Sequence, residues 1–310
     1  MKKISKNFLK LFLSKKKNHK VYIKTMLNRI LNPVKTLLLP SNYYQGKNIL
    51  ITGGGSGLGK QMAIQYSQLG GDVMILGRNE KKLANAVEKV NTDNLNYHVL
   101  DVRDEKAIKN LAEKLESQNQ LPDIVINNAA GNFISRSQTL SSNAWNTIID
   151  IVLRGTVNMT SEFGRRMIDT NKNGVFLNIS TTYAQTGSAF VVPSAIAKAG
   201  CDNLTKSLAA EWGKYGIRFL SIAPGPIYTE GAFSRLDPDG KFSNLAEKKL
   251  PLGRFGQKEE IANLATFLTS EHNNWMTGQI INFDGGEVVG NSGEFNGLHM
   301  LTNEDWDKLL

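Results

Sequence analysis

The sequence contains a single cysteine, Cys201, so no disulfide can form within the chain. Cys201 lies in an apolar helical stretch, where cysteine usually packs as a small hydrophobic residue. The four histidines are scattered, and none pairs with a cysteine or an acidic cluster at metal-ligand spacing. We therefore expect neither a disulfide framework nor a metal site.

Acidic residues are absent from the first part of the chain, where Asp72 is the first. Residues 1–47 contain twelve Lys and Arg, whereas residues 48–310 have a net charge of −3, so the overall charge of +9 comes from the N-terminal segment. A core of that charge offers no basic surface for nucleic acid. No apolar run reaches the roughly 18 residues of a membrane span, so we expect no stable membrane insertion.

The first 40 residues form a basic leader, with Ile4, Phe8 and Phe12 at helical spacing among lysines. An acid-free amphipathic segment at the N-terminus is typical of a mitochondrial transit peptide, and we expect a protein of the mitochondrial matrix. A membrane-surface helix or a disordered basic arm are the alternatives. The last residues, Asp-Lys-Leu-Leu, are not a peroxisomal signal of the Ser-Lys-Leu type.

From residue 41 to 310 the sequence predicts one α/β domain. Short apolar runs at 48–52, 72–76, 97–100, 123–127, 175–179, 218–222 and 279–283 alternate with helix-length segments, including 141–169 and 193–213. This alternation predicts a doubly wound parallel sheet (Rossmann-like) with helices on both faces. The irregular span 226–250 follows a strand end and is the expected position of a substrate lid.

A glycine-rich turn follows the first strand and opens the first helix, which is the context of a dinucleotide-binding site. Its glycines would let the backbone approach a pyrophosphate at the helix N-terminus. The expected cofactor contacts of this turn are Thr52, Gly53, Gly54, Gly55, Ser56, Gly57, Leu58 and Gly59.

The end of the second strand distinguishes between the two nicotinamide cofactors. An NAD site needs an acidic residue there, but the sequence has Gly77 followed by Arg78. Because a guanidinium without a carboxylate suits a 2′-phosphate, we expect NADPH. Arg78 as an ordinary solvent-exposed residue is the alternative.

These motifs resemble those of the short-chain dehydrogenase/reductase family. The resemblance runs from residue 47 to about 288 through TGGGSGLG, NNAAG (127–131), the AKAG helix segment, PGPIYT (224–229) and FDGG (283–286). It implies that Asp101 lies near the adenine and that Pro224, Gly225, Pro226 and Ile227 contact the cofactor. It also implies that Lys198 binds the nicotinamide ribose and that Thr181 replaces the family's serine.

Two positions of the family's catalytic set differ here. Ser194 stands at the position of the tyrosine, and Val152 at that of a helix asparagine. Segments such as TTYAQTGSAFVVPSAIAKAG and GPIYTEGAFSRLDP resemble the mitochondrial 2,4-dienoyl-CoA reductase branch of the family. That resemblance implies an active site of Tyr183, Asn132, Ser194 and Lys198, and an unsaturated fatty acyl-CoA substrate contacted by Arg103, Phe133, Ser141 and Arg235.

Plain structural roles for these residues remain open. Tyr183 could be a pocket-wall aromatic, Asn132 a turn former, and Arg103 a partner of Asp104. At the level of function, the alternatives are a carbonyl-reducing enzyme of the same family and a nucleotide-binding scaffold without catalysis. The family commonly forms tetramers through the two long helices, so the resemblance also implies a homotetramer.

Overall fold

The computed structural model describes residues 38–90, 92–229, 247 and 249–309. In this part of the chain seven strands form one sheet in the order β3-β2-β1-β4-β5-β6-β7, and all neighbouring strands are parallel. The strands are β1 (Asn48–Thr52), β2 (Asp72–Gly77), β3 (Leu95–Val99), β4 (Ile124–Asn127), β5 (Gly174–Ile179), β6 (Ile217–Pro224) and β7 (Gln279–Phe283). This confirms the predicted single doubly wound domain.

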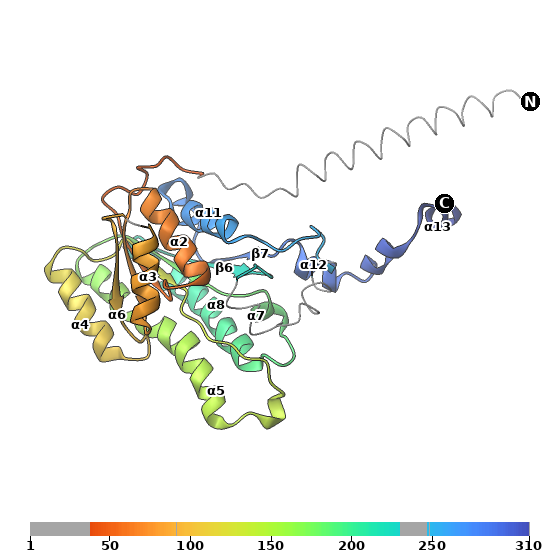
Figure 1. Ribbon diagram of the computed structural model, residues 1–310, viewed down its shortest axis with the longest axis horizontal. Helices are drawn as coiled ribbons and strands as arrows, with labels where there is room; N and C mark the ends of the chain where they lie inside the picture. The colour runs from red at the N-terminus through yellow and green to blue at the C-terminus, as the bar shows by residue number, and fades with distance from the viewer. Residues whose placement is uncertain (1–37, 91, 230–246, 248, 310) are drawn as a thin grey trace, which may run out of the picture.

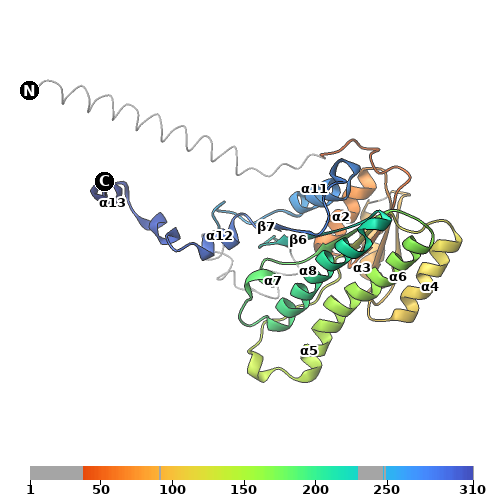
Figure 2. The same ribbon diagram turned by 180° about the vertical axis from the view of Figure 1, so that it is seen from behind.

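Helices cover both faces of the sheet (Figure 1 and, from behind, Figure 2). One apolar layer joins the sheet to α2 (Gly57–Gln68), α3 (Glu80–Val90) and α11 (Lys258–Thr269). The opposite layer joins it to α4 (Glu105–Ser117), α6 (Gly155–Asp169) and α8 (Val192–Trp212). The central strands β4, β5 and β6 are buried at every position, as expected for parallel strands covered on both sides.

Local sequence signals set several helix starts. Asp104 accepts a hydrogen bond from the Ala107 amide at the start of α4, and Ser141 accepts one from the Ala144 amide at the start of α5 (Ser142–Ile149). Such capping bonds satisfy amide groups that have no partner within the helix. The short helix α7 (Tyr183–Thr186) comes directly before α8, while α12 (Glu287–Ser292) and α13 (Asn303–Leu309) extend away from the sheet (Figure 1).

One predicted helix differs in detail. The segment 141–169 is not a single α-helix, because a π-helical turn at Asp150–Arg154 separates α5 from α6. Within this turn the Val152 carbonyl accepts hydrogen bonds from Thr156 Oγ1 at 2.7 Å and from Cys201 Sγ at 3.5 Å. Apolar periodicity does not distinguish such a rare turn from the α-helix around it.

Strand order reverses between β1 and β4, since β2 and β3 lie on one side of β1 and β4 to β7 on the other. Ligands of doubly wound proteins bind at such a reversal, outside the carboxyl ends of the strands. The predicted leader lies almost entirely outside the described residues, but Leu39 is described and packs in the core.

Candidate functional site

The turn between β1 and α2 has a backbone that requires glycine. Gly53 and Gly57 have φ angles of +67° and +55°, a region that L side chains rarely adopt. A Cβ at Gly59 would lie 2.5 Å from both the Gly53 oxygen and Asn128 Nδ2, and one at Gly54 would lie 2.5 Å from Ile75. The turn is therefore closed against the sheet, with its backbone exposed to a ligand.

Thr52 and Asn128 hold this turn in place. Thr52 Oγ1 accepts hydrogen bonds from the amides of Asn128 at 3.0 Å and Ala129 at 2.9 Å. In return, Asn128 Nδ2 donates to the carbonyls of Thr52 at 3.0 Å and Gly53 at 3.3 Å. Sequence reasoning assigned Asn128 no role of its own, because these bonds join segments that are far apart in the chain.

The N-terminus of α2 suits an anionic group. Within the described chain Ser56 makes no side-chain capping bond, and the first turn of α2 contains no acidic residue. Unpaired amides and the helix dipole both favour a phosphate at such an end. The glycine backbone and these amides together fit the pyrophosphate of a dinucleotide.

Beside this turn, Asp101 and Arg103 form an ion pair after the end of β3. Arg103 Nη2 lies 2.6 Å from Asp101 Oδ2, and Nε lies 3.0 Å from Oδ1. The Arg103 hydrogen bonds hold the pKa of Asp101 below its usual range, and the charge of Arg78 adds to this effect. The suggested pairing of Arg103 with Asp104 is wrong, since Asp104 instead caps α4.

The segment Pro224–Ile227 begins at the carboxyl end of β6, one of the strands on the other side of β1. The Gly225 amide donates to the Phe283 carbonyl at 3.1 Å, and the Pro224 carbonyl accepts from the Thr182 amide at 3.3 Å. These bonds hold the end of β6 beside the segment that carries Tyr183.

Asn132, Tyr183 and Ser194 form a chain of hydrogen bonds from three different segments. Asn132 Nδ2 donates to Tyr183 Oη at 3.3 Å, and Tyr183 Oη lies 3.1 Å from Ser194 Oγ. Asn132 Oδ1 accepts from the Phe133 amide at 2.9 Å, which turns the amide nitrogen toward the tyrosine. Because a phenol oxygen can accept two hydrogen bonds, Tyr183 can keep its own proton for a substrate oxygen.

Lys198 lies one turn of α8 beyond Ser194 and is buried. Its ammonium group donates to the Ile179 carbonyl at the end of β5. Burial lowers the pKa of Lys198, and the charges of Cys201 and Asp202 oppose that shift. Thr181, the predicted replacement for the family's serine, is buried on the segment between Ile179 and Tyr183.

The predicted acyl-CoA residues are only partly grouped. Phe133 packs against the apolar cluster of Ile148, Ile151, Val152, Ala197 and Cys201, directly beside Asn132. The Ser141 hydroxyl accepts the capping bond of α5. Arg235 and most of the predicted lid lie outside the described residues.

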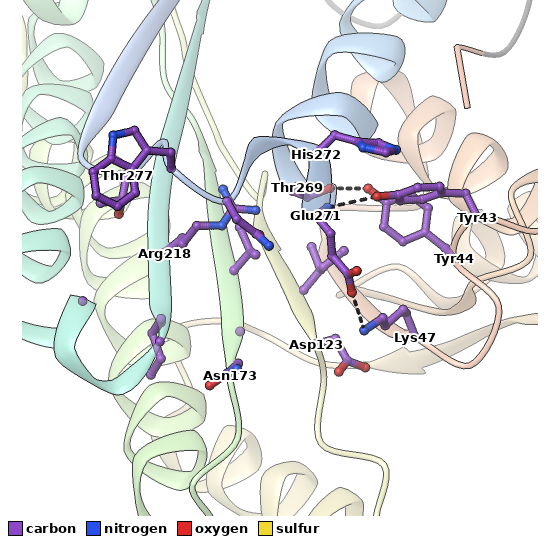
Figure 3. A pocket seen from close by; sticks show the side chains of 18 residues that line it. Tyr43, Tyr44, Lys47, Asp123, Asn173, Arg218, Thr269, Glu271, His272 and Thr277 are labelled. Atoms are coloured by element: carbon purple, nitrogen blue, oxygen red, sulfur yellow. Dashed lines mark hydrogen bonds and ion pairs between the residues drawn. The ribbon is translucent and has the colours of Figure 1, made fainter. Parts of the chain in front are cut away.

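A cavity of about 910 Å³ lies at the opposite edge of the sheet (Figure 3). Its lining includes Ile124, Gly174 and Ile217, where β4, β5 and β6 begin, and none of the predicted site residues. Its charged groups have structural partners: Lys47 lies 3.1 Å from Glu271, Asp123 accepts from Lys172 at 2.8 Å, and Arg218 donates to main-chain carbonyls. We therefore do not assign the chemistry to this cavity.

Within the described residues no helix is long and apolar enough to cross a membrane. The same residues contain no group of three or more His, Cys, Asp or Glu that could hold a metal ion.

A glycine-lined turn at a strand reversal, next to a buried lysine and a tyrosine, defines a dinucleotide-dependent oxidoreductase of the α/β class. A family model described as Enoyl-(Acyl carrier protein) reductase matches residues 53–287, and the chain belongs to the short-chain dehydrogenase/reductase family, whose members bind a nicotinamide cofactor.

Two relatives and one solved structure illustrate the similarity. A probable 2,4-dienoyl-CoA reductase of Caenorhabditis elegans, named as (3E)-enoyl-CoA-producing, is 41% identical and aligns over 88% of this chain and 91% of its own. A probable (2E)-enoyl-CoA-producing 2,4-dienoyl-CoA reductase of Bacillus subtilis is 42% identical over 78% and 96%. A crystal structure of a putative 2-deoxy-D-gluconate 3-dehydrogenase from Agrobacterium tumefaciens with bound NADP matches with a TM-score of 0.73 at 28% identity, over 80% and 99%.

Proposed function

We propose that this protein reduces 2,4-dienoyl-CoA to trans-3-enoyl-CoA with NADPH, as a step in the mitochondrial β-oxidation of unsaturated fatty acids. The observation that carries the proposal is the placement of Tyr183 Oη between Asn132 and Ser194, at 3.3 and 3.1 Å. The relatives named as 2,4-dienoyl-CoA reductases support the same reaction class.

The chemistry of the substrate explains why a tyrosine is not needed at position 194. A carbonyl reductase must protonate an alkoxide directly, which requires an acidic hydroxyl over the carbonyl carbon. In a dienoyl thioester, reduction at C5 moves the negative charge along the conjugated system to the thioester oxygen. That oxygen needs hydrogen-bond donors rather than a strong acid.

Tyr183 and Asn132 are the donors that we assign to this oxygen. The phenol O–H and the amide N–H are neutral hydrogen-bond donors, so they can stabilise the developing dienolate without a proton transfer. Ser194 orients the tyrosine hydroxyl by its hydrogen bond. Protonation at Cα then leaves the double bond between C3 and C4, which gives the 3-enoyl product.

The cofactor assignment rests on the turn around Gly53 and on Arg78. NADPH, when bound, supplies the hydride. The turn and the start of α2 would hold the pyrophosphate, Lys198 the nicotinamide ribose, and Arg78 the 2′-phosphate, next to the ion pair of Asp101 and Arg103. Phe133, Ser141 and Arg103 remain our proposed contacts to the acyl-CoA, together with Arg235.

The decisive test measures NADPH oxidation with a 2,4-dienoyl-CoA and, separately, with a panel of ketones, and identifies the product. We expect turnover of the dienoyl-CoA to a 3-enoyl-CoA. Turnover of ketones alone would show a carbonyl reductase, and binding of NADPH without any turnover would show a nucleotide-binding scaffold. A 2-enoyl-CoA product would keep the enzyme class but refute the assigned site of protonation.

The choice of cofactor has its own test. Arg78→Asp should weaken NADPH binding by about tenfold to a hundredfold and improve the relative use of NADH, because a charge-assisted contact to phosphate becomes a repulsion. Lys214→Asp makes the same change of charge on an exposed residue just before β6 begins, at the other edge of the sheet, and should leave the ratio unchanged. Equal use of both cofactors by the unmodified protein would contradict the assignment.

A further inference from the structure

A line of polar side chains on α8 continues beyond the residues that the proposed function uses. Ser194, Lys198 and Asp202 follow one another at four-residue spacing, which places them on one face of the helix. All three are buried, with relative exposures of 2%, 6% and 6%. Asp202 is therefore the next polar group along the helix after Lys198.

The carboxylate of Asp202 is only half satisfied. Its Oδ1 accepts a hydrogen bond from Ser221 Oγ on β6 at 3.0 Å. Among the described residues Oδ2 makes no hydrogen bond of good geometry, although the Ser180 hydroxyl lies close enough to lower the pKa of Asp202. A buried carboxylate with one unpartnered oxygen is costly, and a nearby cation is the usual compensation.

Two cations act on Asp202, and they differ in how far they are exposed to solvent. Burial is the largest influence on the pKa of Asp202 and raises it, whereas the charges of Lys198 and Lys206, both on α8, lower it. The hydroxyls of Ser180, after β5, and Ser221, on β6, also lower it. Lys206 lines a surface cavity of about 470 Å³ together with Asp202, whereas Lys198 is enclosed in the protein.

Lys198 needs such a countercharge. Burial disfavours its ammonium form, and its only recorded partner in the described chain is the Ile179 carbonyl. Asp202 and Cys201 are the two groups whose charges favour the ammonium form. Burial raises the pKa of the Cys201 thiol, so at neutral pH the thiol is uncharged and Asp202 remains.

We propose that Asp202 is a positioning residue whose buried carboxylate keeps Lys198 cationic, and thereby able to bind the ribose hydroxyls of the cofactor. This inference rests on the part of the proposed function that assigns Lys198 to the cofactor. It is independent of the acyl substrate.

The test measures the dissociation constant of NADPH against pH, by nicotinamide fluorescence and without any acyl-CoA. In the unmodified protein the affinity should fall on the alkaline side, as Lys198 loses its proton. In Asp202→Asn the same fall should begin about one pH unit lower, because one nearby buried charge changes a proton affinity by about tenfold. Lys198→Met should show weaker binding without this alkaline fall.

Ser221→Ala is the matched control, since it removes the hydrogen bond of Asp202 but keeps the charge. Its pH profile of NADPH affinity should match that of the unmodified protein. A shift as large as that of Asp202→Asn would show that the shift arises from altered packing and not from the lost charge. If Asp202→Asn does not fold, Asp202→Ser, a smaller neutral residue, should give the same shift. A neutral variant whose profile overlays that of the unmodified protein would overturn the proposal.

The test of Asp202 and the test of the proposed reaction can fail independently of each other. A protein that binds NADPH with these profiles but reduces no dienoyl-CoA would refute the reaction and support the role of Asp202. Unaltered NADPH binding by Lys198→Met at every pH would instead refute the roles of both Lys198 and Asp202.

Discussion

At the residue scale, the position of Tyr183 is the central feature of this site. The chain folds back between α7 and α8, so that residues 183 and 194 come within hydrogen-bonding distance. A phenol at position 183 therefore reaches the same region that position 194 occupies on α8. The proposed site therefore has a tyrosine hydroxyl that comes from a segment other than α8 and lies beside an asparagine amide.

The first prediction compares the two hydroxyls. Tyr183→Phe removes one donor from the proposed oxyanion site and should lower kcat by roughly 10²–10³, which is about 3–4 kcal/mol. The affinity for acyl-CoA should change little, because this bond strengthens only as charge develops. Steady-state kinetics with a 2,4-dienoyl-CoA provide the measurement.

Ser194→Ala is the control for that experiment. It should keep much of the activity, since Asn132 still contacts the tyrosine hydroxyl. Near-normal turnover by Tyr183→Phe together with an inactive Ser194→Ala would show that the serine has taken over the tyrosine's role.

Only some of these residues could be predicted from the sequence pattern itself. The positive-φ glycines are readable from the chain, because their spacing after a strand is a local pattern. The grouping of Asn132, Tyr183 and Ser194 was implied by resemblance alone, since no local pattern brings them together. For Arg103, the structural alternative of pairing with Asp104 was wrong, because an ion pair across a tight turn depends on side-chain rotamers that spacing does not define.

At the scale of secondary structure, the seven apolar runs predicted the strands to within a few residues at each end. Parallel strands covered on both faces leave an unambiguous apolar pattern. The π-helical turn at Asp150–Arg154 was not foreseen. At this turn the Cys201 thiol of α8 donates a hydrogen bond to the Val152 carbonyl, a tertiary contact that the local sequence does not indicate.

The contact between α2 and the sheet provides the second prediction. Gly59→Ala would place a methyl group 2.5 Å from the Gly53 oxygen and Asn128 Nδ2, so the turn must open. We expect a loss of about 1–3 kcal/mol in the free energy of unfolding, as for other overpacked sites, and weaker NADPH binding. Denaturant unfolding and a binding titration provide the two measurements.

Gly213→Ala, at the residue directly after α8, is the matched control. A Cβ there meets nothing within 4 Å, and the residue has a helical φ of −56°. Its stability should be unchanged or slightly higher, because alanine restricts the unfolded chain more than glycine does. An equal loss of NADPH binding in both variants would show that the effect is not specific to the close contact at Gly59.

At the scale of the whole molecule, the charge is divided between two parts. The first 47 residues contain twelve basic groups and no acid, while the remainder is slightly acidic. The core of the domain begins with Leu39 and Tyr44, which belong to the same apolar cluster as residues of β1, α2 and α11, and the Tyr44 hydroxyl donates to the Thr266 carbonyl on α11. Eleven of the twelve basic groups precede residue 38 in the sequence, where we propose that they act in targeting.

The last prediction concerns this segment. A chain beginning at Leu38 should fold and reduce dienoyl-CoA like the full chain, because it keeps the described core. A chain beginning at Ser41 loses Leu39, which is 9% exposed, and should be less stable by up to about 2 kcal/mol while keeping its activity.

In cells, a fluorescent fusion of the full chain should enter mitochondria, and the same fusion beginning at Leu38 should stay in the cytosol. A full-length fusion found in the cytosol or in peroxisomes would contradict the transit peptide, and failure of the shorter chain to fold would show that residues before Leu38 belong to the domain.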